Sequence, residues 1–88
     1  VDQLRRSSCS VSNNIAESYH RSSTKDKIKF LNIAKGENDE TKRNIHRSFR
    51  KGFIQKEKSD YLVEKYTVLI RGIAAYQRFL LLQELETK

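Results

Sequence analysis

The chain of 88 residues contains no proline and only three glycines. Few residues therefore interrupt its long periodic segments, as expected of an all-helical protein. No stretch approaches the roughly 20 apolar residues of a membrane span. The N-terminus also lacks the order of basic, apolar and small residues that marks a signal peptide. We therefore expect a soluble, cytoplasmic protein with no membrane partner.

The chain has one cysteine, Cys9, which excludes an internal disulfide. In its serine-rich helical surroundings we expect a small buried side chain rather than a reactive thiol. A hydrophobic content of 36% supports a single domain, residues 1–88, with a core that is only marginally able to stabilise itself. A partner or a second copy of the chain is therefore expected.

The sequence has few motifs typical of metal-binding or catalytic sites. Glu17 and His20 have the Glu-x-x-His spacing of di-iron helical bundles, but such a site needs two of these pairs and two further glutamates. His46 has no carboxylate three positions before it. No nucleophile motif and no glycine-rich phosphate loop is present. We therefore expect no catalytic residue, no metal and no cofactor.

Helical spacing predicts three helices, over residues 2–21, 24–51 and 57–86, in an antiparallel helical bundle. In the first helix, steps of three and four residues place one narrow stripe on a single face. Serines beside the stripe would let a neighbouring helix approach closely. The stripe consists of Leu4, Ser8, Val11, Ile15 and Tyr19.

The second helix has a start signal at the polar cluster Ser22, Ser23 and Thr24, which offers an N-cap, with Asp26 three residues after Ser23 as the acidic partner of a capping box. Its stop signal is Gly52, where a left-handed C-cap is easily made. Phe53 and Ile54 are expected to anchor the connection that follows. Three-and-four spacing predicts a buried face with one polar member. This face consists of Ile28, Leu31, Ala34, Asn38, Thr41, Ile45 and Phe49.

Gly36 lies in the interior of the second helix, where glycine costs roughly 1 kcal/mol relative to alanine. Close contact between helix backbones would explain it, and the small Ala34 nearby favours this interpretation. A tolerated defect is the alternative.

The third helix carries two apolar stripes, and it is apolar almost all round near residues 79–82. Two short helices cannot cover such a surface, so a further helix or neighbouring subunits should cover it. Tyr61, Tyr66 and Tyr76 are expected in the core. For bundle or oligomer packing this helix contributes Leu69, Ile73 and Leu80.

The formal net charge of +7 is concentrated in one segment. Residues 42–58 contain seven basic residues and one acidic residue, Glu57, so this segment has a formal charge of +6. Helical spacing predicts one ridge of basic side chains on the face opposite the buried stripe. It consists of Arg43, Arg47 and Arg50, with Lys51 beside them. Such a ridge attracts phosphate backbones through counterion release. The alternative is a solvated helix face that keeps the protein soluble.

Arg5 and Arg6 of the first helix are a weaker case, because either could pair with Glu17, with Glu40 or with a carboxylate of another subunit. The candidate nucleic-acid contacts are therefore Lys42, Arg43, Arg47, Arg50, Lys51, Arg5 and Arg6.

Three short sequence motifs resemble those of a known family. They are QLRR at residues 3–6, NIAES at residues 14–18 and FLNIAKG at residues 30–36. Together they resemble the small bacterial four helix bundle protein family. That family includes the 23S rRNA intervening-sequence proteins and the accessory proteins of diversity-generating retroelements. Ser18, His20 and Glu37 depart from the usual family phrases, which leaves the fold intact.

The resemblance implies a homo-oligomeric ring, typically a pentamer, with a basic surface and a further helix before residue 3. Retroelement members are non-catalytic helpers that bind a reverse transcriptase and its RNA, and the phrases do not assign this chain to either branch. Our leading hypothesis is a non-enzymatic oligomer that binds RNA or another nucleic-acid complex. The alternative is a protein-interaction scaffold without nucleic-acid contact.

Overall fold

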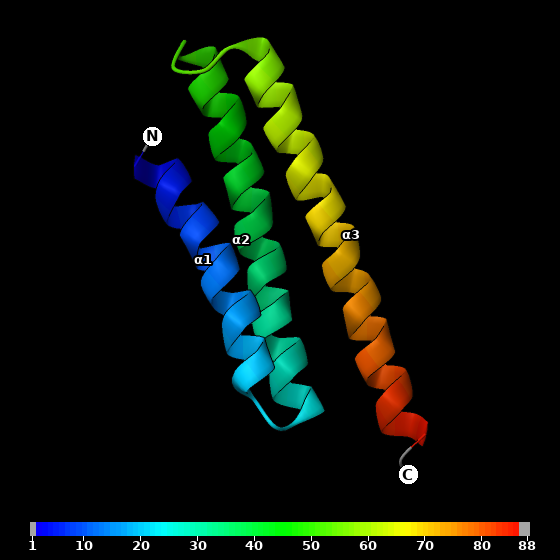
Figure 1. Ribbon diagram of the computed structural model, residues 1–88. Coiled ribbons are helices and arrows are strands. Elements are labelled where there is room, and N and C mark those ends of the chain that lie inside the picture. Colours follow the sequence, from blue (N-terminus) through cyan, green and yellow to red (C-terminus); the bar gives the residue numbers. More distant parts are fainter. Residues whose placement is uncertain (1, 87–88) are drawn as a thin grey trace.

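The computed structural model describes residues 2–86, in which three α-helices and no strands are present. The helices are α1 (Asp2–His20), α2 (Thr24–Arg50) and α3 (Lys56–Glu86). They form an elongated bundle with extents of 53 × 19 × 13 Å, in which consecutive helices run antiparallel (Figure 1). The predicted all-α fold is therefore confirmed.

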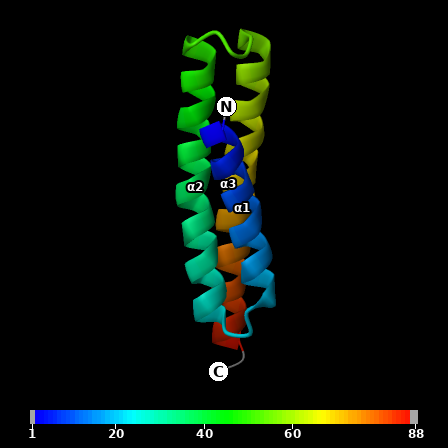
Figure 2. The ribbon, with the colours of Figure 1, turned by 90° about the vertical axis from the view of Figure 1, so that its left-hand side faces the viewer.

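The central element of the bundle is α2, which packs against both other helices. Among the described residues, no Cα atom of α1 lies within 8 Å of one in α3. These two helices flank α2 (Figures 1 and 2). They meet through side chains, because the rings of Tyr19 and Tyr76 lie 5.7 Å apart. One side of the space between α1 and α3 is therefore closed by α2, and the other faces solvent.

Both ends of α2 follow from local sequence. The backbone N–H of Asp26 donates to the Ser23 hydroxyl at 3.1 Å, so Ser23 is the N-cap. At the other end Gly52 has φ +79°, which glycine adopts without a Cβ clash. The N–H groups of Gly52 and Phe53 donate to the carbonyls of Phe49 and Ser48 at 3.0 and 2.9 Å, which is a Schellman motif.

The core is narrow and half polar. Its buried apolar side chains are Val11, Leu31, Ala34, Ile45, Ile73 and Leu80. Its buried polar side chains are Ser7, Ser18, Asn38, Thr41, Asn44, Ser48, Ser59 and Gln77. Since the described residues bury only six apolar side chains against eight polar ones, hydrophobic burial alone stabilises this bundle weakly.

Most of the buried polar groups satisfy one another or the helix backbone. The hydroxyls of Ser18 and Thr41 donate to carbonyls in the preceding turn. The Gln77 side chain joins α3 to α2 by donating to the Asn32 side-chain oxygen at 2.8 Å. Asn38 is the exception, because neither polar atom of its buried amide has a partner among the described residues.

Several side chains expected in the core are exposed, and these expectations were wrong. Tyr19, Phe49 and Tyr61 are 62%, 39% and 57% exposed, and the thiol of Cys9 is also exposed. The helical spacing places each on an apolar stripe correctly, but a three-helix arrangement covers only part of each stripe. Tyr66 and Tyr76 are half-buried.

The expected close helix contact at Gly36 is also wrong within this chain. Gly36 is exposed, and a Cβ added there would meet nothing within 4 Å. The described helices therefore give no steric reason for glycine at this position.

The C-terminal part of α3 exposes an apolar surface, as expected from its sequence. Phe79, Leu81, Leu82 and Leu85 are each more than half exposed, while Leu80 is buried. Within residues 2–86, no helix is both long enough and apolar enough to cross a bilayer.

Candidate nucleic-acid interface

The predicted cations gather where the N-terminal turns of α1 lie beside the C-terminal half of α2 and its connection to α3 (Figures 1 and 2). We call this region the basic end. Arg5, Arg6, Arg43, Arg50 and Lys51 are exposed there. Lys42 and Arg47 are half-buried, so the seven candidates do not share one environment.

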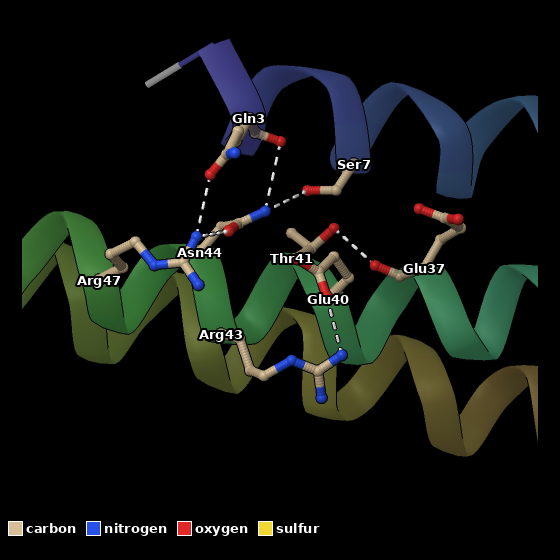
Figure 3. A network of polar contacts seen from close by, with 8 residues as sticks. All are labelled: Gln3, Ser7, Glu37, Glu40, Thr41, Arg43, Asn44 and Arg47. Atoms are coloured by element: carbon tan, nitrogen blue, oxygen red, sulfur yellow. Dashed lines mark hydrogen bonds and ion pairs between the residues drawn. The ribbon is translucent and has the colours of Figure 1, made fainter.

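Arg47 points toward α1 and is held by neutral groups. Its Nη1 donates to the side-chain oxygens of Gln3 at 2.9 Å and Asn44 at 3.0 Å (Figure 3). Neither acceptor carries a charge, so these bonds fix the guanidinium without cancelling its charge. Arg47 is therefore an oriented cation at the seam between α1 and α2.

Asn44 links the two helices beneath this arginine. Its amide nitrogen donates to the Gln3 backbone carbonyl at 3.3 Å and to the Ser7 hydroxyl at 3.2 Å (Figure 3). Because the Asn44 oxygen accepts from Arg47, one buried amide orders the first turns of α1 and the arginine together. The basic end is thus built on a fixed backbone.

Arg43, one turn earlier, has a different environment. Its Nη2 lies 2.8 Å from a carboxylate oxygen of Glu40, and this hydrogen bond raises the pKa of Arg43 further (Figure 3). Both side chains are largely exposed, so the pair contributes little to stability. The neighbouring carboxylate does, however, offset the positive charge of Arg43.

The predicted ridge of Arg43, Arg47 and Arg50 does not present one row of unpaired cations. Lys42, which lies outside that ridge, extends toward α3, where its ammonium lies 3.4 Å from the Thr67 hydroxyl. Arg47 extends toward α1, and Arg43 is paired. Of the predicted ridge, Arg50 and Lys51 remain as exposed cations beside the connection.

The carboxylates suggested as partners for Arg5 and Arg6 pair with other arginines. Glu17 lies 2.6 Å from Arg21, and Glu40 pairs with Arg43. Arg6 instead borders a shallow polar groove between α1 and α2 that Glu37 and Glu40 also line. Arg6 therefore faces acidic neighbours, which makes it a weaker phosphate contact than Arg50 or Lys51.

Sequence reasoning missed Gln3 and Asn44 and assigned Phe53 a different role. Asn44 could have been found, because it follows Thr41 by three residues and precedes Ser48 by four, on the buried face. Gln3 could not, since its partner lies 44 positions away. Phe53 was expected to anchor the connection, but its side chain is 61% exposed.

The residues expected to pack the bundle or an oligomer have mixed burial. Val11, Ile73 and Leu80 are buried, and Leu4, Ser8, Ile15 and Leu69 are half-buried. Between α1 and α3 an apolar groove of about 420 Å³ remains. It is lined by Val11, Ser12, Leu62, Lys65, Tyr66, Val68 and Leu69.

The described part of the chain does not contain a cluster of metal-binding side chains. Glu17 pairs with Arg21. Within residues 2–86, no three His, Cys, Asp or Glu side chains are grouped in a way that could hold a metal ion.

Comparison with known proteins identifies one family. The family model described as 23S rRNA-intervening sequence protein matches residues 1–75. No curated protein and no solved structure matches the chain.

Proposed function

Because the chain belongs to the 23S rRNA-intervening sequence protein family, we propose that it is a non-enzymatic bundle protein that binds RNA at its basic end. Binding would take place through phosphate contacts from Arg47, Arg50 and Lys51. Such contacts carry little sequence information, so the ligand is defined by its charge and shape. In this proposal the protein acts as a homo-oligomer, so that each assembly carries several basic ends.

The observation that carries this proposal is the arrangement of Arg47, which holds its guanidinium on two neutral amide oxygens. Arg43, in contrast, lies 2.8 Å from a carboxylate oxygen of Glu40, which offsets its charge. Arg50 and Lys51 follow it at the end of α2, in a segment that carries +6. A duplex or single strand would exchange its counterions for these cations.

The proposal is tested by titrating labelled structured RNA and duplex DNA into the protein at several salt concentrations. We expect the logarithm of the affinity to fall linearly with the logarithm of the salt concentration. The variant Arg50→Gln/Lys51→Gln should bind more weakly, and its salt slope should be smaller by about 1 for each phosphate that the variant no longer binds.

A matched variant controls for the loss of charge. Lys29→Gln/Arg78→Gln removes the same charge from exposed positions away from the basic end and should bind like the unmodified protein. Equal weakening in both variants would mean that net charge, and not the basic end, is responsible. No binding at low salt would overturn the proposal.

The exposed apolar surface of α3 favours a second candidate function, a protein-interaction scaffold. Phe79, Leu81, Leu82 and Leu85 could bind an apolar partner protein, and a reverse transcriptase is the partner that the retroelement resemblance implies. This candidate requires a protein partner that stays bound after nuclease treatment and at high salt.

A further inference from the structure

An exposed phenylalanine stands at the centre of the basic end. Phe53 occupies the position after Gly52 in the Schellman motif, where an apolar side chain usually packs on the third-last residue of the helix. Here that residue is Ser48, which is too small to cover a phenyl ring. The ring therefore stays 61% exposed, although the backbone N–H of Phe53 is fixed to the Ser48 carbonyl.

A small polar pocket lies directly beside this ring. It encloses about 40 Å³ and is lined by Gln3, Leu4, Asn44, Arg47, Ser48, Lys51 and Phe53. That volume holds roughly one water-sized group, so a phosphate oxygen fits and a nucleobase does not. Two of its lining side chains are cations, and one of them, Arg47, is held in place by Gln3 and Asn44 (Figure 3).

We infer that the connection after α2 binds an unpaired nucleotide. The base stacks on the exposed face of Phe53, and the adjoining phosphate contacts Lys51 and Arg47. This inference rests on the proposed function and narrows its ligand to single-stranded segments, loops or ends. In a duplex the faces of the bases are already stacked on one another, so only an unpaired base can use the ring.

Tyr61 is a weaker candidate for the same role. Its ring is 57% exposed, but the ammonium groups of Lys58 and Lys65 each lie 5.6 Å from the ring centroid. A base would have to displace these cations, and Tyr61 does not line the pocket beside Arg47 and Lys51. Phe53 combines an exposed ring with one cation that is held in place, Arg47, and a second, Lys51, that lines the same pocket.

The chain contains no tryptophan, so Phe53→Trp introduces a unique fluorophore at the proposed stacking position. We expect titration with a short oligoadenylate to quench its fluorescence with saturation. An abasic phosphodiester of equal length keeps the phosphates and should not quench it. Phe79→Trp is the matched control, because Phe79 is 54% exposed and lies in the C-terminal part of α3, away from the basic end.

A second variant, Phe53→Leu, keeps an apolar side chain and removes the aromatic face. We expect its affinity for oligoadenylate to fall about tenfold, as for the loss of one base stacked on an aromatic ring. Its affinity for duplex should stay unchanged. A parallel titration with oligodeoxyadenylate distinguishes RNA from single-stranded DNA as the preferred ligand.

The inference is overturned if the tryptophan at position 53 is quenched no more than the one at position 79, or if Phe53→Leu binds oligoadenylate like the unmodified protein. In either case, steeply salt-dependent binding by the unmodified protein would leave the proposed function standing. Absence of binding to every nucleic acid at low salt would remove both.

Discussion

Arg43 and Arg47 are one helical turn apart, yet they present their charges differently. Arg43 pairs with Glu40, whereas Arg47 is held by the neutral oxygens of Gln3 and Asn44. A phosphate approaching Arg43 has to compete with a carboxylate, and one approaching Arg47 does not. Residue type and spacing alone would have ranked the two arginines equally.

The buried environment of Asn38 allows a specific prediction about the free energy of unfolding. Its amide is fully buried without a partner among the described residues, and an unpaired buried polar group costs about 1–3 kcal/mol. Asn38→Leu keeps the number and branching of the side-chain heavy atoms and removes both polar atoms. We therefore expect the free energy of unfolding to rise by about 1–3 kcal/mol in urea denaturation.

Asn38→Ala serves as the comparison, because it removes the amide but leaves an unfilled space that offsets the gain. If Asn38→Leu instead lowered the free energy of unfolding while Asn38→Ala raised it, crowding by the larger leucine would outweigh the relief of the unpaired amide. If both variants lowered it, the amide would not carry the expected cost.

At the scale of the helices, a glycine inside α2 and a glycine just after it are expected to respond oppositely to substitution. A Cβ at Gly36 would meet nothing within 4 Å in a helix interior, so Gly36→Ala should stabilise the protein by about 1 kcal/mol. Gly52 has φ +79°, so Gly52→Ala should destabilise it by about 1–2 kcal/mol. Thermal denaturation followed by circular dichroism measures both changes.

The Gly36 variant also reports on neighbouring subunits. A loss of stability in Gly36→Ala, together with a change in subunit count, would show that a helix of another copy packs against this position. For Gly52, an unchanged melting temperature would contradict the role of the left-handed cap.

The helices and their ends could be predicted from the sequence because the signals are local. Ser23 and Gly52 lie within a few residues of the backbone groups that they position. Helical spacing also groups side chains correctly by face. It does not reveal which part of a face another helix covers, which is why Tyr19, Phe49 and Tyr61 were wrongly expected in the core.

The candidate site could be predicted only in part, for a related reason. The excess of positive charge is visible in the sequence, and Arg50 and Lys51 lie exposed at the end of α2. Arg47 contacts Gln3, 44 positions away, and Lys42 contacts Thr67, 25 positions away, and no local pattern encodes either contact. The exposure of Phe53 depends on the small size of Ser48 across the cap.

At the scale of the whole molecule, the exposed apolar surface predicts assembly. We expect light scattering to show a homo-oligomer, with the pentamer implied by the family resemblance as the specific expectation. Leu82 and Leu85 are 61% and 69% exposed, so Leu82→Lys/Leu85→Lys should shift the protein toward monomers without unfolding it.

The matched control for this shift is Arg71→Ala/Arg78→Ala, which changes exposed polar positions on the same helix. It should keep the subunit count of the unmodified protein. If the unmodified protein were already monomeric, the assembly prediction would be wrong. The apolar surface of α3 would then be expected to bind another protein.

The order of the helices has an electrostatic consequence of its own. In this antiparallel bundle α3 begins at the end where α2 finishes, and α1 begins beside Asn44 and Arg47, short of that end (Figures 1 and 3). Both starts therefore lie in the basic end. Each helix start carries a partial charge of roughly +0.5 and each helix end roughly −0.5, so this end of the bundle gains about half a positive charge from peptide dipoles alone. The backbone thus adds to the field of the arginines and lysines, and the molecule should approach a polyanion end-on, along its long axis.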